Sequence, residues 1–180
     1  MAFIKKRVKA METPLQFENL NTPDDVINFA LKNGIETEPL DVSGLTELLG
    51  IKMYFEPMQG DNSGSLALDK KTGEWRMTVN SLHHPHRQRF TIAHEIGHHI
   101  KHGAFQQNFL DSSFFRNGET NTLEIEANNF AAELLMPTKR FRELIASGVT
   151  KVDEIAEYFK VSVMAVRVRA KLLGYQGHNL

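Results

Sequence analysis

The sequence predicts an α+β fold, in which a small, mostly antiparallel sheet packs on one helix and an all-helical segment follows. Three short runs rich in branched and aromatic residues, at 51–55, 66–68 and 75–79, indicate the strands. An apolar pattern with helical spacing then runs from Pro85 to Gly103, and the patterns beyond Thr122 are all helical. With 180 residues, the chain has room for one domain and a small appendage.

Composition excludes several classes of protein. Hydrophobic residues make up 41% of the chain and charged residues 24%, as in ordinary globular domains. A formal net charge of -1 excludes a global basic field that would attract nucleic acid or membranes. Cysteine is absent, which excludes disulfides and thiolate metal sites. The sequence shows neither an apolar run of membrane-spanning length nor a signal-peptide pattern, so the expected location is the cytoplasm.

The remaining elements follow from start and stop signals. Thr22 and Pro23 predict the start of a first helix that ends at Gly34, and a second short helix is expected over 42–49. The turn at 69–73 joins the last two strands into a hairpin. The polar, turn-rich segment 103–122 is expected to be a long loop. Further helices are expected over 123–136, 141–146, 152–159 and 163–173.

The segment His94-Glu95-Ile96-Gly97-His98 matches the pattern H-E-x-x-H and lies inside the predicted helix. Residues four apart on a helix share one face, about 6 Å apart along the axis, so His94 and His98 can bind one Zn²⁺. Glu95 is then placed to act as general base and acid toward a water molecule at the metal.

A chance match is the alternative interpretation. With 8 histidines and 15 glutamates in the chain, about 0.03 accidental matches are expected. His102 also lies four residues after His98, but His94 and His102 are about 12 Å apart along the axis, so the three cannot share one ion. We therefore expect His102 to interact with the end of the helix.

A catalytic zinc requires a third protein ligand. Ala104 stands where a metzincin would have its third histidine, which excludes that class. The next predicted helix offers Glu124 and Glu126, which flank its apolar stripe on opposite edges. Helical phase alone does not choose between them.

Two stretches together resemble the ImmA/IrrE-type zinc metallopeptidases. They are the residues from Arg89 to His99 and those from Glu124 to Met136-Pro137. The resemblance extends from about Gly64 to Pro137, continues weakly into the C-terminal helices, and is slight over 1–50.

The resemblance implies a zincin-like metallopeptidase with His94, His98 and Glu126 as zinc ligands, because the glutamate of the family's second motif maps to Glu126. It also implies a bacterial or phage-like cytoplasmic endopeptidase. Its protein substrate would be a helix-turn-helix repressor, cleaved to derepress stress or mobile-element genes. Substrates of zincins lie along an edge strand, and the hairpin 64–80 is the candidate edge.

The expected organisation is a flexible N-terminus at 1–20, a zincin-like domain at 21–148 and a helix-turn-helix-like extension at 149–180. Arg167, Arg169 and Lys171 on the second helix of this extension could touch phosphates, but the extension carries little net positive charge. Packing on the core or docking of a protein partner is favoured over DNA contact. The alternative function for the chain is a non-catalytic module that sequesters a transcription factor or contacts DNA.

Overall fold

The structure is a computed structural model that describes residues 20–103, 108–111 and 122–175, with only the backbone described for 108–111. The flexible segment predicted at 1–20 lies outside the described residues except for Leu20. The elements in chain order are α1 (Pro23–Lys32), α2 (Val42–Leu48), β1 (Ile51–Glu56), β2 (Gly64–Asp69), β3 (Glu74–Asn80), α3 (Pro85–His102), β4 (Asn108–Asp111), α4 (Thr122–Leu135), α5 (Thr138–Ala146), α6 (Val152–Phe159) and α7 (Val163–Leu172).

The four described strands form one sheet in the order β1-β3-β2-β4. β2 pairs antiparallel with both β3 and β4, whereas β1 and β3 are parallel. Gly73 has a φ of 73° and donates its N–H to the carbonyl oxygen of Asp69 at 2.7 Å, which closes the hairpin between β2 and β3. The α+β class and the mostly antiparallel sheet are confirmed.

Two expectations about the sheet are wrong. The segment 103–122 is not all loop, because β4 lies within it and pairs with β2. The hairpin 64–80 is not an edge, because β2 and β3 are the two inner strands and β1 and β4 form the edges of the described sheet. Local turn signals predicted the hairpin, but the edge depends on pairings between distant segments.

The helices start where their capping residues predict. In α1, the Thr22 hydroxyl accepts from the backbone N–H of Asp25, and the Asp25 carboxylate accepts from the N–H of Thr22. In α2, the Asp41 carboxylate accepts two backbone N–H groups of the first turn. Pro85 takes the first position of α3, where its missing N–H costs nothing.

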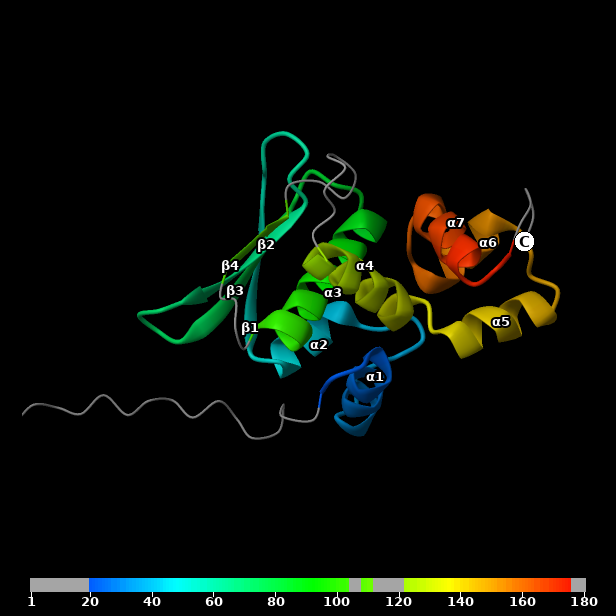
Figure 1. The fold of residues 1–180 in the computed structure, drawn as a ribbon, viewed down its shortest axis with the longest axis horizontal. Helices are drawn as coiled ribbons and strands as arrows, with labels where there is room; N and C mark the ends of the chain where they lie inside the picture. Colours follow the sequence, from blue (N-terminus) through cyan, green and yellow to red (C-terminus); the bar gives the residue numbers. More distant parts are fainter. Residues whose placement is uncertain (1–19, 104–107, 112–121, 176–180) are drawn as a thin grey trace, which may run out of the picture.

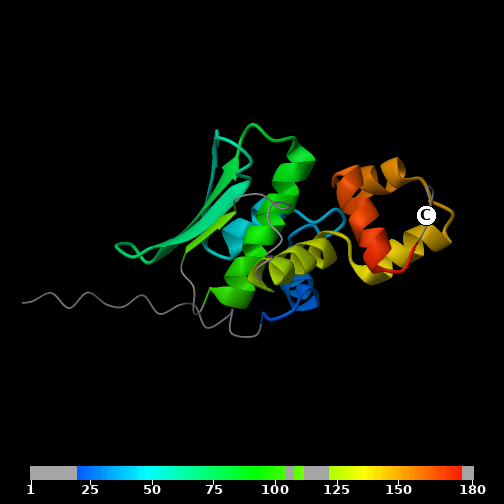
Figure 2. The same ribbon diagram turned by 45° about the horizontal axis from the view of Figure 1, so that its top comes forward.

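Helix α3 is the centre of the molecule (Figure 1). It packs against β2 and β3 on one side and against α4 on the other. In the turned view of Figure 2, the sheet lies on one side of α3 while α5, α6 and α7 lie together at the opposite end. The layered arrangement leaves α3 covered along most of its length.

The C-terminal helices share the core with the rest of the chain. Phe141 of α5 stacks on Phe159 of α6, with ring centroids 6.0 Å apart and planes 7° apart. Arg89 of α3 donates to the carbonyl oxygens of Leu40 and Lys160 at 2.9 and 3.1 Å. These contacts anchor the turn between α6 and α7 on the helix that carries the H-E-x-x-H pattern.

No helix of the described residues has both the length and the apolar character needed to cross a membrane.

Candidate metal centre

Helix α3 buries a polar segment in its middle. All residues from Thr91 to His98 are buried, and the exposed fractions of His94, Glu95 and His98 are 0%, 0% and 1%. A glutamate and two histidines inside a core carry a large desolvation cost unless they have partners, which makes this segment the candidate functional site.

Glu124 completes a cluster with the two histidines. The Nε2 atoms of His94 and His98 lie 3.0 Å apart, and the Glu124 carboxylate oxygens lie 3.2 and 3.3 Å from them. Ligand atoms of the three side chains all lie within 4.8 Å of one another, and among the described residues they form the one such group of three or more. Because a zinc–nitrogen bond is about 2.0–2.1 Å long, the two nitrogens are close enough to bind one ion. The donor set fits a metal.

Glu126 does not join this cluster. Its carboxylate lies 3.6 Å from the Nε2 atom of His102, one helical turn beyond His98, and its side chain is about half exposed. The choice of Glu126 from the family resemblance therefore disagrees with the arrangement of the side chains. His102 is itself buried and is the last residue of α3, so its expected interaction with the helix end stays a prediction beside this contact with a carboxylate.

A close approach of α3 and α4 brings Glu124 to the histidines. A Cβ atom on Gly97 would lie 3.2 Å from the carbonyl oxygen of Ala127 and 3.3 Å from the Cβ atom of Phe130. Glycine at 97 therefore allows the backbones of the two helices to approach at this level. Ala127, three residues after Glu124, is fully buried in the same contact.

Asn128 holds the other side of the His94 ring. Its Oδ1 atom lies 3.1 Å from Nδ1 of His94, while Nε2 of that ring faces Glu124. The arrangement fits a histidine with its proton on Nδ1 and its Nε2 lone pair directed at the cluster. Sequence reasoning missed Asn128, although its position four residues after Glu124 places both on one helical face.

Glu95 lies against the first residue of β2. A Cβ atom added to Gly64 would lie 3.2 Å from Oε1 of Glu95 and 2.5 Å from Cγ2 of Thr91. Gly64 therefore leaves room for the carboxylate at the end of the strand. Sequence reasoning missed this role because the contact joins elements that are far apart in the chain.

The cluster shifts the ionisation of its members. Burial alone would raise the pKa of the Glu124 carboxyl, but hydrogen bonds and charges from His94 and His98 outweigh burial and hold this pKa far below its usual range. Burial lowers the pKa of His98, partly opposed by Glu124. Burial also lowers the pKa of the neighbouring His99 to about 4. His98 and His99 thus favour the neutral form, which is the form of histidine that binds metals.

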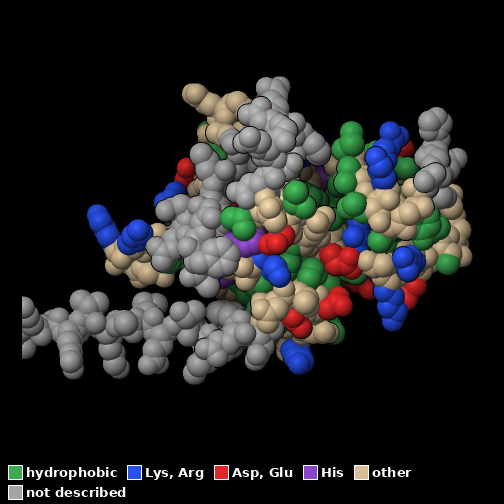
Figure 3. All heavy atoms as spheres, in the orientation of Figure 1, with side chains coloured by type: hydrophobic (Ala, Val, Ile, Leu, Met, Phe, Trp, Pro, Cys, Tyr) green, Lys and Arg blue, Asp and Glu red, His purple; other side chains and the backbone are tan. Residues whose placement is uncertain are grey.

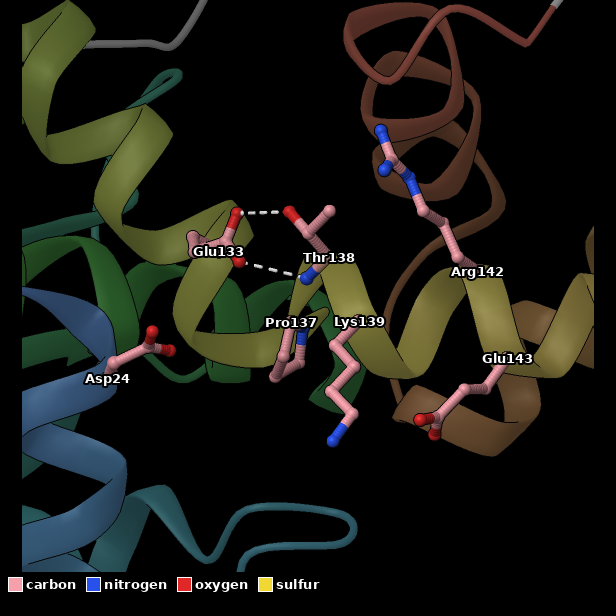
Figure 4. A pocket seen from close by; sticks show the side chains of 7 residues that line it. All are labelled: Asp24, Glu133, Pro137, Thr138, Lys139, Arg142 and Glu143. Atoms are coloured by element: carbon pink, nitrogen blue, oxygen red, sulfur yellow. Dashed lines mark hydrogen bonds between the residues drawn. The ribbon is translucent and has the colours of Figure 1, made fainter.

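A separate hollow of about 520 Å³ lies beside the start of α5. Figure 4 shows the residues that line it, among them Asp24, Glu133, Lys139 and Arg142, and shows Glu133 accepting hydrogen bonds from Thr138. None of the residues predicted to act at the metal lines this hollow. It mixes acidic and basic groups, and Glu133 is already occupied by its hydrogen bonds.

Known proteins resemble this chain in sequence and in fold. "Metallopeptidase ImmA" of Bacillus subtilis (strain 168) is 30% identical over 118 residues, a match that covers 64% of this chain and 66% of the relative. A solved structure described as a Mycobacterium tuberculosis transcriptional regulator superposes with a TM-score of 0.57 at 17% identity, covering 83% of this chain and 46% of that one. The chain thus spans just under two thirds of the first protein and about half of the second.

The family match covers most of the described chain. The model of peptidase family M78, described as the IrrE N-terminal-like domain, matches residues 46–171, from α2 to α7. This range includes both stretches on which the resemblance was noted, and a metallopeptidase family implies a metal ion at a site such as the His94, His98 and Glu124 cluster. The chain belongs to the ImmA/IrrE family of metallopeptidases.

Proposed function

We propose that this chain is a zinc-dependent endopeptidase in which His94, His98 and Glu124 hold the metal and Glu95 acts as general base and acid. The observation that carries the proposal is the convergence of two buried imidazole nitrogens and one carboxylate on a common point. Two histidines and a glutamate match the ligand set of known catalytic zinc sites, which use three protein ligands and keep one position open.

A bound zinc ion would act as a Lewis acid, which lowers the pKa of a water molecule and polarises a peptide carbonyl. The residues of the chain orient the ligands, balance charge and exclude solvent. Asn128 orients the His94 ring through Nδ1, and the negative charge of Glu124 balances part of the charge of a cation. Helix α3 and the sheet exclude bulk solvent from the buried faces of both histidines.

Glu95 is the candidate for proton transfer. It is fully buried, lies between the two histidines in sequence, and its carboxylate lies beside Gly64 at the start of β2. We infer that it accepts the proton of the attacking water and donates it to the leaving amine. A purely structural metal site would not require such a residue and would normally have four protein ligands.

The third ligand is revised from Glu126 to Glu124. The two residues are two positions apart, about 200° around a helix, so only one of them can face α3 at the level of His94. Glu124 has that position, and Glu126 lies closer to His102. Glu126 is then a partner of a buried histidine rather than a ligand.

For the substrate, we propose a helix-turn-helix transcriptional repressor that is cleaved to derepress stress or mobile-element genes. This part rests on the family resemblance alone. The alternative is a non-catalytic module of the same fold, which would bind the regulator without cutting it.

Zinc titration of three variants tests the proposal. We expect Glu124→Ala to lose zinc affinity and activity together, Glu126→Ala to keep both, and Glu95→Gln to keep zinc while cleavage falls at least about 10²-fold. Zinc affinity is measured by competition with a chromophoric chelator, and cleavage of a helix-turn-helix repressor is followed on gels.

Three outcomes would contradict parts of this assignment. Loss of zinc in Glu126→Ala with retention in Glu124→Ala would restore Glu126 as the ligand. Cleavage by Glu95→Gln at the wild-type rate would remove Glu95 from the mechanism. Tight binding of the repressor by the zinc-loaded wild type without any cleavage would favour the binding module.

A further inference from the structure

Helix α7 exposes an apolar stripe. Met164, Val168 and Leu172 recur every four residues, and their exposed fractions are 61%, 42% and 59%. On the opposite side, Val166 and Ala170 are buried in the core. Every other helix among the described residues exposes at most one large hydrophobic side chain, such as Leu31 of α1 or Ile125 of α4. The stripe is thus specific to α7.

Basic residues follow one side of the stripe. At 100° per residue, Arg167 and Lys171 lie roughly 60° and 20° to one side of Met164, whereas Val168 and Leu172 lie roughly 40° and 80° to the other. Both basic side chains are exposed, and α7 contains no acidic residue. In Figure 3, hydrophobic and basic side chains appear together on the lobe formed by the C-terminal helices. The exposed face is therefore apolar along one half and positive along the other.

This face is poorly suited to nucleic acid. Arg169 would be a third phosphate contact, but it is buried, with an exposed fraction of 6%. It donates to the carbonyl oxygen of Met136 at 3.1 Å and to the Thr138 hydroxyl at 2.8 Å, and it pairs with Glu133. Only two cations remain on the exposed face, and three aliphatic side chains would gain nothing from phosphates.

We propose that the exposed face of α7 is a docking surface for an amphipathic helix of another protein, one with an aliphatic stripe bordered on one side by glutamate or aspartate. Side chains spaced four apart form the ridges through which helices pack side by side. The acidic border of the partner would meet Arg167 and Lys171, and this charge pairing would fix its orientation. A second copy of the chain is not the occupant, because the described helices offer no such acidic and apolar face. The surface is separate from the metal centre.

Synthetic peptides test the surface directly. The probe is a fluorescein-labelled helical peptide of about 18 residues, long enough to form a helix, with leucine every third or fourth position and glutamate along one border of that stripe. A second peptide carries lysine in place of each glutamate, and binding to the full chain is measured by fluorescence anisotropy. We expect the glutamate peptide to bind at least about 10-fold more tightly than the lysine peptide.

Variants separate the two halves of the face. We expect Val168→Asp to weaken binding of the glutamate peptide at least about 10-fold, and Arg167→Glu with Lys171→Glu to reverse the preference between the peptides. Leu31→Asp, at an exposed leucine on α1, is the matched control and should leave binding unchanged. Circular dichroism verifies that each variant is folded.

Two results would overturn the proposal. One is equal binding of the glutamate peptide by the wild type and Val168→Asp. The other is tighter binding of a DNA duplex of about 20 base pairs than of either peptide. In that case, Arg167→Glu with Lys171→Glu would weaken DNA binding and Val168→Asp would not.

Discussion

The side-chain amide of Asn128 decides which nitrogen of His94 is available at the metal centre. Oδ1 of the amide can accept a hydrogen bond only if Nδ1 of the ring carries the proton, which leaves Nε2 with its lone pair. A histidine of the opposite tautomer would present an N–H to the metal. Asn128 is thus a positioning residue for the proposed ligand set.

Asn128→Ala is expected to lower zinc affinity by about 10- to 100-fold, since loss of an outer-shell partner frees both the tautomer and the orientation of the ring. Asn128→Asp keeps an acceptor at the same place and should retain most of the affinity. Asn129→Ala, at the exposed neighbouring position, is the control. Competition with a chromophoric chelator measures the zinc affinity of all three variants. Equal affinities in the wild type and Asn128→Ala would contradict the positioning role of Asn128.

Gly64→Ala is expected to reduce cleavage by about 10-fold or more with unchanged zinc affinity, because the new Cβ atom would press on the Glu95 carboxylate and on Thr91. Thr91→Ser removes the methyl group that would lie 2.5 Å away, so it relieves the closest of the three contacts, the others being with the Thr78 carbonyl oxygen and with Glu95. Rates are compared for both single variants and the double variant. Full recovery in the double variant would show that the effect comes through Thr91 and not through Glu95.

At the residue scale, the H-E-x-x-H pattern predicts His94, Glu95 and His98, whereas helical phase leaves Glu124 and Glu126 open and the family resemblance chose Glu126. His94, Glu95 and His98 share one helix, so their relation follows from helical spacing alone. The proposed third ligand comes from a second helix, and its identity depends on how that helix is rotated against α3. The packing of Gly97 on Ala127 sets this rotation, and a contact between two helices cannot be deduced from the periodicity of either one.

At the element scale, Glu133 joins the end of α4 to the start of α5. Its carboxylate accepts from the backbone N–H and the hydroxyl of Thr138 at 2.8 Å each, and it pairs with Arg169 of α7. Burial would raise the pKa of Glu133, but these hydrogen bonds and the charge of Arg169 outweigh it and lower this pKa from its ordinary value of 4.5.

The sign of this shift predicts a pH dependence. A carboxyl with a lowered pKa in the folded state stabilises the protein above pH 4.5, and this contribution is lost as the pH falls through the folded-state pKa. Glu133→Gln should therefore reduce the free energy of unfolding by about 1–2 kcal/mol at pH 7 and by less at pH 4.

Urea unfolding of the metal-free proteins at the two pH values checks this expectation. Glu154→Gln, at an exposed glutamate of α6, is the control and should show a small, constant difference. A Glu133→Gln effect that is equal at pH 4 and pH 7 would mean that the charge of this carboxylate contributes nothing to stability.

Elements with strong local signals were predicted, and elements defined by distant pairing were not. Capping residues and glycine stops located α1 and α2, and the turn at 69–73 located the hairpin. Strand β4 was missed because its four residues lie in a polar segment and are ordered as a strand only by pairing with β2. The parallel pairing of β1 with β3 was likewise invisible to local patterns.

At the scale of the whole molecule, the contacts of α5 suggest a different boundary from the predicted one at 148. Phe141 of α5 contacts Phe159 and Tyr175, with ring centroids 6.0 and 6.1 Å apart. The Nε atom of Arg140 donates to the Tyr158 hydroxyl at 2.7 Å. We therefore propose that the C-terminal unit begins at Thr138 and comprises α5, α6 and α7.

Two truncations distinguish the boundaries. A chain that ends at Pro137 removes the whole unit and should still bind zinc, since every proposed ligand precedes that residue. A chain that ends at Ser147 keeps α5 but exposes Phe141, and it should aggregate. Gel filtration reports whether each truncated chain aggregates, and zinc titration reports whether it binds the metal. The boundary at 148 would stand if the longer chain were monomeric and the shorter one unfolded.

The hydrogen bonds of Arg89 have a consequence for the order of folding. They join α3 to Leu40 and Lys160, which are 49 and 71 positions away along the chain. Contacts that close such long loops carry a larger entropic cost than local helix formation, so we expect them to form after the main folding barrier. Interactions made after the barrier mainly slow unfolding. Arg89 would then govern how long the assembled molecule persists, with little influence on how fast it forms.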